Sequence, residues 1–163
     1  SKLSTNKILT KLNLLKSTIF NLCISNYDAH AKNISFFVNK RSLELSPLYD
    51  LVNIAMYPDI HNEFAMAFGD EFDSNKIGTF DMVGFCVHTN IQPRLIKNEL
   101  SSIIANIKKN IETIKNETLS LCDENEINFL ESLEKNILLT CKKHENMIQT
   151  LVDDYKIYKK EYE

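Results

Sequence analysis

Three oxygen-bearing side chains in the first third of the chain could together support phosphoryl transfer. Asp28 and Asn33 lie in the run Asn-Tyr-Asp-Ala-His-Ala-Lys-Asn, which begins at residue 26, and Asp50 ends the later run Ser-Pro-Leu-Tyr-Asp. One carboxylate can orient and deprotonate a hydroxyl group, while a second carboxylate and an amide oxygen can hold magnesium beside ATP. The residue types and their order therefore point to phosphoryl transfer.

The segment between Asn33 and Asp50 is typical of a β-hairpin. Two short β-prone runs, 34–38 and 43–45, flank the polar turn 39–42. Antiparallel pairing places the residue before the first strand and the residues after the second strand at the same end of the ribbon. We therefore expect Asn33 and Asp50 to approach one shared ion, with Asp28 in the loop that enters this end.

The remaining elements predict a mainly α (α+β) fold. Apolar residues spaced by three and four predict a helix over 4–25, capped by Ser4 or Thr5. A strand over 63–68, a polar loop over 69–78 and a helix over 79–88 follow. Two longer helices are predicted over 92–119, with Asn90 as a cap and Pro93 in the first turn, and over 124–160, with Asp123 and Glu126 as a capping box.

Composition narrows the class of protein. The chain has 163 residues and a net charge of -3, so we expect one domain over 1–163 and no direct nucleic-acid partner. No apolar run reaches membrane-spanning length and no signal peptide opens the chain, so we expect no membrane partner. The four cysteines are far apart and form no metal-binding pair, so we expect buried free thiols in a reducing cytoplasm.

Taken with the hairpin, the two runs resemble the C-terminal lobe of HipA-like serine/threonine kinases, the toxin components of bacterial toxin–antitoxin systems. The resemblance implies a protein-kinase-like helical lobe whose small β-hairpin carries the catalytic and metal-binding loops. It also implies ATP as co-substrate, Mg²⁺ as cofactor, and a cytoplasmic protein substrate such as an aminoacyl-tRNA synthetase. A helix-turn-helix antitoxin is the partner that the family implies.

The resemblance also implies a role for five residues. Asp28 corresponds to the catalytic base, and Asn33 and Asp50 correspond to magnesium ligands at the nucleotide site. Lys32 and His30 correspond to groups beside the transferring phosphoryl group, where Lys32 also contacts ATP. Asn-Tyr precedes Asp28, where ordinary protein kinases carry His-Arg. The arrangement Asp-x-His-x-x-Asn, in which His30 follows Asp28 by two residues, also occurs in lipid kinases. His30 could share the acid–base work or could form a structural hydrogen bond.

The sequence lacks a Gly-rich phosphate loop, because Gly69, Gly78 and Gly84 are dispersed. We therefore expect an N-terminal lobe, on the same or a separate chain, to be needed for activity. Two alternatives remain open: a non-catalytic helical interaction module or pseudokinase half, and a small-molecule or lipid-type kinase lobe. Tyr49 is expected to pack in the core, and His144 is expected to be a hydrogen-bonded packing residue.

Overall fold

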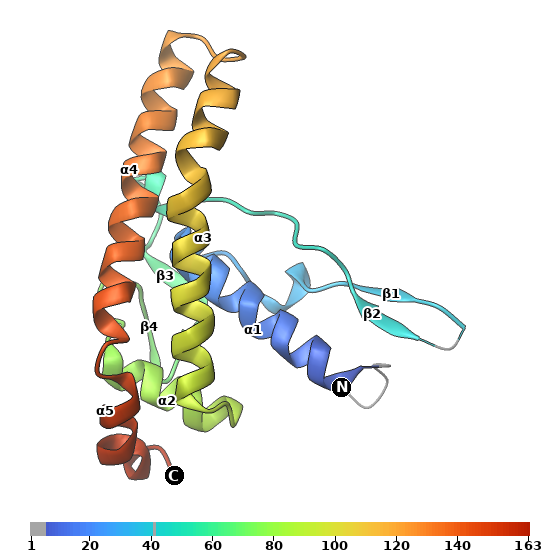
Figure 1. Cartoon of the computed structure of the whole chain (residues 1–163), viewed down its shortest axis with the longest axis vertical. Helices are drawn as coiled ribbons and strands as arrows, with labels where there is room; N and C mark the ends of the chain where they lie inside the picture. Colours follow the sequence, from blue (N-terminus) through green and yellow to red (C-terminus); the bar gives the residue numbers. More distant parts are fainter. Residues whose placement is uncertain (1–5, 41) are drawn as a thin grey trace.

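Two long antiparallel helices form the spine of the molecule. The computed structural model describes residues 6–40 and 42–163. Helices α3 (Pro93–Leu119) and α4 (Glu124–Met147) run side by side, and α1 (Lys7–Cys23) crosses them and packs against α3 (Figure 1). Helices α2 (Thr79–Thr89) and α5 (Leu151–Tyr158) pack against each other at the end of the spine where the chain terminates. The fold is mainly helical, as the sequence predicts.

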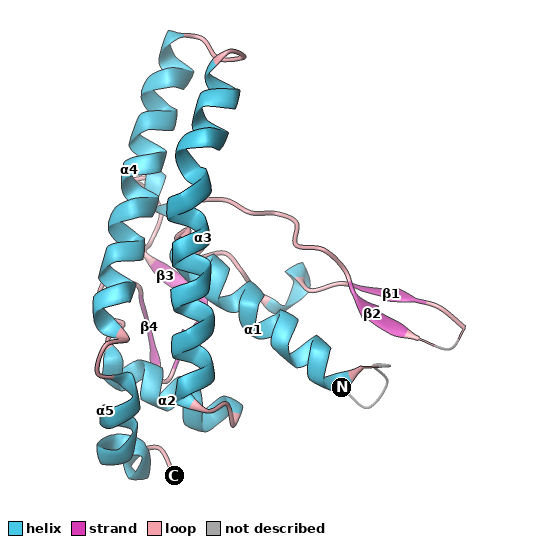
Figure 2. Cartoon of the chain, in the orientation of Figure 1, coloured by secondary structure: helices cyan, strands magenta, loops and turns pink. Residues whose placement is uncertain are grey.

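Two separate two-stranded ribbons complete the fold (Figure 2). Strands β1 (Phe36–Val38) and β2 (Leu43–Leu45) pair antiparallel with Phe36 opposite Leu45, which confirms the predicted hairpin. Strands β3 (Glu63–Phe68) and β4 (Glu71–Asp73) form the second ribbon. The first ribbon projects away from the helices, and the second lies against them. Short 3-10 helices occur at η1 (Ala31–Asn33), η2 (Ile54–Met56) and η3 (Lys159–Glu161).

Helix starts follow local capping chemistry. Helix α1 begins after Asn6, whose side chain accepts a hydrogen bond from the backbone N–H of Leu9, and the proposed caps Ser4 and Thr5 lie outside the described residues. Helix α4 begins at the predicted capping box of Asp123 and Glu126. These caps satisfy backbone donors that have no partner within their own helix.

Three predictions about the elements are wrong. The helix predicted over 124–160 is two helices, because the chain turns at 148–150 so that α5 can pack against α2. The loop predicted over 69–78 contains β4, since a turn at Gly69, with a φ of +61°, folds the chain back onto β3. Asn90 caps the end of α2 in the left-handed region and does not start α3, whose N-cap is Gln92.

The core lies where α1, α2, α3 and α5 meet the second ribbon. Its fully buried side chains include Ile19, Met82, Ile96 and Leu151. Three of the four cysteines are buried and all four are free, as expected. Burial raises the pKa of the Cys86 thiol to about 12, and a hydrogen bond with Cys141, together with burial, raises the pKa of Cys23. Thiols with raised pKa values stay protonated at neutral pH and are poor nucleophiles.

No helix within residues 6–40 and 42–163 combines the length and the apolar character that a membrane-spanning helix needs.

Candidate active site

The loop that leaves α1 is anchored on both sides. Ser25 adopts a φ of +56°, which turns the chain sharply out of the helix. The backbone N–H of Asn26 donates to the carbonyl of Asn21 in α1 at 2.9 Å, and the carbonyl of Tyr27 accepts from the N–H of Ala65 in β3 at 2.8 Å. Asp28 follows directly, so the backbone that carries the candidate base is attached to two separate elements.

Asn33 and Asp50 meet at the open end of the first ribbon. The side-chain Nδ2 of Asn33 donates to Oδ2 of Asp50 at 2.7 Å. The ribbon extends toward them by a further hydrogen bond, from the N–H of Ser46 to the carbonyl of Ser35 at 2.9 Å. The hairpin thus brings into contact two side chains that are 17 residues apart, as expected from antiparallel pairing.

The backbone of Asp50 is held in an uncommon conformation. Its φ is +57°, in the left-handed region that few residues other than glycine adopt, although Asp tolerates it better than most. The side chain of Asn26, only 3% exposed, donates to the Asp50 carbonyl at 3.2 Å and to Oδ1 of Asn21 at 3.0 Å. Asn26 therefore connects α1, the loop of Asp28 and the Asp50 backbone.

The residues present fit a magnesium ion. The Oδ1 atom of Asn33 is buried and has no hydrogen-bond partner in the described structure, so this oxygen is available as a metal ligand. It lies on the same amide that contacts the Asp50 carboxylate. No cluster of three or more His, Cys, Asp or Glu side chains suited to a metal occurs among the described residues. Magnesium needs no such cluster, since one or two protein ligands commonly share it with water and substrate phosphates.

The side chains of the other three predicted site residues form fewer polar contacts. Asp28 is exposed, and within residues 6–40 and 42–163 its side chain forms no hydrogen bond or ion pair. Lys32 is also exposed, and its side chain forms no hydrogen bond or ion pair with the described residues. His30 is half-buried, and its Nδ1 has no hydrogen-bond partner among the described groups. The structure therefore brings the side chains of Asn33 and Asp50 into contact, whereas the side chains of Asp28, His30 and Lys32 form no hydrogen bond or ion pair with either of them in the part of the chain that the structure describes.

Tyr49 corrects one expectation, because it does not pack in the core. Its side chain is 45% exposed. Its hydroxyl lies 2.8 Å from Oγ of Ser35 and donates to the carbonyl of Lys32 at 3.1 Å. Tyr49 thus closes the base of the hairpin and holds the backbone beside Asn33.

A small cavity lies beside these residues. It has a volume of about 70 Å³, and its walls come from α1, the loop that leaves α1, the hairpin and β3. Asn26, His30 and Asn33 line it. Sequence reasoning assigned no role to Asn26, although it stands at the head of the motif, since no spacing rule reveals which carbonyl a buried amide will reach.

Known proteins resemble this chain in sequence. The model of the HipA-like C-terminal domain family matches residues 2–114. The serine/threonine-protein kinase toxin HipA of Shewanella oneidensis is 32% identical over 148 residues, which cover 91% of this chain and 34% of that protein. The putative kinase Y4mE of Sinorhizobium fredii is 26% identical over 110 residues, which cover 68% of this chain and 26% of that protein.

A solved structure agrees with the sequence relatives. The complex of HipA, HipB and operator DNA from Shewanella oneidensis matches with a TM-score of 0.85 and 31% identity, over 93% of this chain and 35% of the matched chain. That complex contains DNA, so the acidic net charge of this chain does not support excluding nucleic acid from its assemblies. The chain spans about a third of the length of the HipA proteins that it matches. By the family match, the identity and the shared fold, the chain belongs to the HipA-like C-terminal domain family.

Proposed function

We propose that this chain is the C-terminal catalytic lobe of a HipA-like serine/threonine protein kinase. It transfers the terminal phosphoryl group of ATP to a hydroxyl group on a cytoplasmic protein, of which an aminoacyl-tRNA synthetase is the family example. The observation that carries the proposal is the 2.7 Å contact between Asn33 and Asp50 beside the anchored loop of Asp28. A turn-forming Asp and Asn would not need to meet in this way.

Asp28 acts as the base in this proposal. Its carboxylate is exposed and has no hydrogen-bond partner among the described side chains, so an incoming substrate hydroxyl can reach it. The anchored backbone on its N-terminal side fixes its position, and positioning is the main contribution a protein makes to phosphoryl transfer.

Asn33 and Asp50 hold magnesium in this proposal. The unpaired Oδ1 of Asn33 and the carboxylate of Asp50 supply the oxygen ligands. The ion would neutralise charge on the ATP phosphates. Lys32, whose ammonium group is free of described partners, adds a second positive charge near the phosphates, and His30 lines the adjoining cavity.

Activity requires an N-terminal lobe, on the same or a separate chain. This lobe supplies the Gly-rich phosphate loop that the chain lacks, and it explains why relatives are about three times as long. Large apolar side chains at the hairpin and at the start of α1 are exposed: Ile8 by 83%, Phe37 by 58% and Val38 by 79%. We place the N-terminal lobe against this surface. By analogy with the HipA and HipB complex, a helix-turn-helix antitoxin binds the assembled kinase.

A non-catalytic role has one observation in its favour. An apolar groove of about 440 Å³ lies between α1, α3 and α4, lined by residues such as Ile107, Ile111 and Leu133. An interaction module would use this groove for a helix of a partner. The groove does not explain the contact between Asn33 and Asp50, so we rank this function second. A small-molecule or lipid-type kinase would keep the same site and change only the acceptor.

A phosphorylation assay on the protein assembled with its N-terminal lobe tests the proposal. Wild-type protein should transfer phosphate from ATP to protein in a magnesium-dependent reaction. Asp28→Asn and Asp50→Asn should each abolish transfer and leave the fold intact. Asp59→Asn, a matched change at an exposed carboxylate outside the site, should keep full activity. Activity retained in either site variant would refute the roles assigned here.

A further inference from the structure

A second, polar cavity of about 240 Å³ lies against the loop that leaves α1. Asn26 and His30 line the active-site cavity, whereas Ser25 and Tyr27 line this one. Alternate residues of the same loop thus point to different cavities. The opposite wall is α4, and the remaining walls come from the end of α1, from η2, from the second ribbon and from the turn that follows this ribbon.

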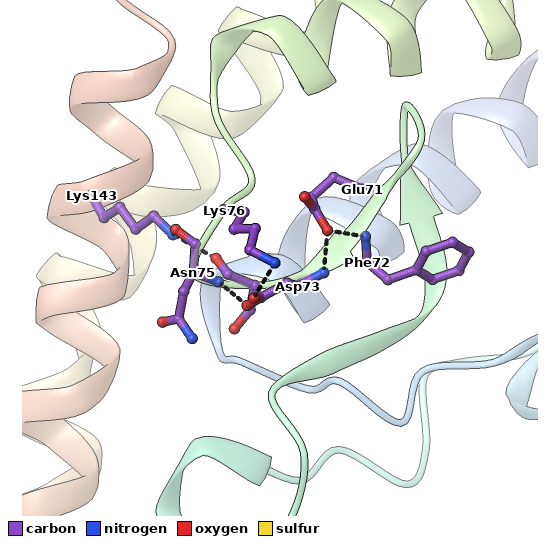
Figure 3. Close-up of polar contacts among 7 residues, drawn as sticks. Glu71, Phe72, Asp73, Asn75, Lys76 and Lys143 are labelled. Carbon is purple, nitrogen blue, oxygen red and sulfur yellow. Dashed lines mark hydrogen bonds and ion pairs between the residues drawn. The ribbon is translucent and has the colours of Figure 1, made fainter.

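Lys143 gives the cavity a positive charge. Lys143 and His144 of α4 line it, and no carboxylate does so in the part of the chain that the structure describes. The Nζ atom of Lys143 donates to the carbonyl of Ser74 at 2.5 Å and to that of Asn75 at 3.5 Å (Figure 3). The nearby carboxylate of Asp73 is engaged elsewhere, with Lys76 at 3.3 Å and the N–H of Asn75 at 2.9 Å.

Lys143 is therefore an ammonium group whose described partners are neutral carbonyls. Partial burial lowers the pKa of Lys143, which means that its surroundings stabilise the positive charge less well than water does. An anion that entered the cavity would offset this deficit.

His144 supplies a second unused group. The residue packs in the interior with only 3% exposed, as expected, but its Nδ1 has no hydrogen-bond partner among the described atoms. Burial, with the charge of Lys143, lowers the pKa of His144 to about 4, so the ring is neutral at pH 7. Its other nitrogen bonds the backbone of Leu22, so Nδ1 carries the lone pair and accepts hydrogen bonds.

The two groups together define the ligand chemistry. We propose that this cavity binds a small oxyanion that keeps a hydroxyl group at neutral pH, represented by hydrogen phosphate. An anionic oxygen accepts from the ammonium group of Lys143, and the P–OH group donates to Nδ1 of His144. Hydroxyl and amide side chains of Thr140 and Asn136 line the same wall and provide further polar contacts. The binding does not depend on the proposed kinase function.

Phosphate and sulfate provide a matched pair of probes. They have similar size and shape, but sulfate has no proton to donate at neutral pH. Each is titrated into the chain at constant ionic strength, with chloride as the balancing anion, while the NMR signals of the His144 ring and the Asn136 side-chain amide are followed. Phosphate should cause saturable shifts. Sulfate should bind at least about tenfold more weakly than phosphate, since it forms one hydrogen bond fewer.

Variants of two neighbouring lysines distinguish binding at a defined site from nonspecific electrostatic attraction. Lys143→Gln should weaken phosphate binding about tenfold or more, whereas Lys142→Gln, which removes the same charge from an exposed residue outside the cavity, should leave it unchanged. Equal binding of sulfate and phosphate, shifts that chloride reproduces, or equal losses in the two variants would overturn the proposal. If Lys143→Gln does not fold, the comparison of sulfate with phosphate on the wild-type chain decides.

Discussion

The amide of Asn33 donates a 2.7 Å hydrogen bond to the carboxylate of Asp50 across the open end of the β1–β2 ribbon. Oδ1 of the same amide is buried and has no hydrogen-bond partner among the described residues. Unpaired buried oxygen is unfavourable, so such an atom is usually explained by a ligand, an ion or water. The hairpin therefore does more than connect two segments: it brings an amide and a carboxylate that are distant in sequence into contact.

Asn26→Ala should loosen this arrangement. The variant removes the donor to the Asp50 carbonyl and to Oδ1 of Asn21, and it leaves both oxygens without that partner. We expect a loss of about 1–3 kcal/mol in the free energy of unfolding, measured by urea denaturation. We also expect faster amide exchange at Asp50. Asn128→Ala, at an exposed site in α4, is the control and should be close to neutral. Equal stability of both variants would show that the Asn26 contacts are unimportant.

Gly84→Ala should destabilise the contact between α2 and the second ribbon. A methyl group at this position would lie 2.5 Å from a ring carbon of Tyr162 and 2.8 Å from Cα of Gly69. The terminal ring could move, but the Gly69 backbone cannot do so cheaply. We expect a loss of about 1–3 kcal/mol, measured by thermal or urea unfolding, because overpacking outweighs the gain in helix propensity.

Gly78→Ala is the matched control for this packing prediction. A methyl group there would have no neighbour nearer than 3.8 Å. Its effect should therefore be much smaller than that of Gly84→Ala. If Gly84→Ala proves as stable as wild type, the close approach of α2 and Gly69 is not a constraint on the fold.

His144 should make the fold less stable in acid. Burial lowers its pKa from an ordinary 6.5 to about 4, so between these values the unfolded chain binds more protons than the folded chain. The free energy of unfolding therefore falls as the pH drops from about 6.5 to about 4, by up to about 3 kcal/mol from this residue. Urea unfolding across this pH range measures the slope.

The control for the pH dependence uses two histidines. His144→Gln should reduce the slope, whereas His61→Gln, at an exposed position, should retain it. A slope that persists in His144→Gln would mean that other groups cause the acid sensitivity.

Local patterns predict the elements well where the forces are local. The apolar spacing of α1, the capping box at Asp123 and the β-prone runs of the first hairpin each depend on neighbours in sequence. The break between α4 and α5 does not, since Ile148 and Leu151 are both buried and continue the apolar stripe through it. Strand β4 was missed because it is short and polar. Its Glu71 carboxylate accepts from the N–H groups of Phe72 and Asp73 (Figure 3).

The candidate site also combines features that local sequence predicts with features that only tertiary packing determines. Antiparallel pairing made the meeting of Asn33 and Asp50 predictable. Two other features depend on tertiary packing, and sequence spacing does not predict them. They are the hydrogen bond from Asn26 to the Asp50 carbonyl and the unpartnered Nδ1 of His144. Tyr49 was expected in the core from its aromatic ring, yet its hydroxyl holds the Lys32 carbonyl at the surface.

Manganese offers the most direct test that Asn33 and Asp50 hold a divalent cation. Mn²⁺ replaces Mg²⁺ at oxygen sites and broadens NMR signals of nearby nuclei. Added to the chain, it should selectively broaden the side-chain amide of Asn33 and the backbone amide of Asp50. The effect should disappear in Asp50→Asn and persist in Asp59→Asn. Broadening that is absent from both residues, or that is centred on the acidic turn at 70–73, would contradict the account.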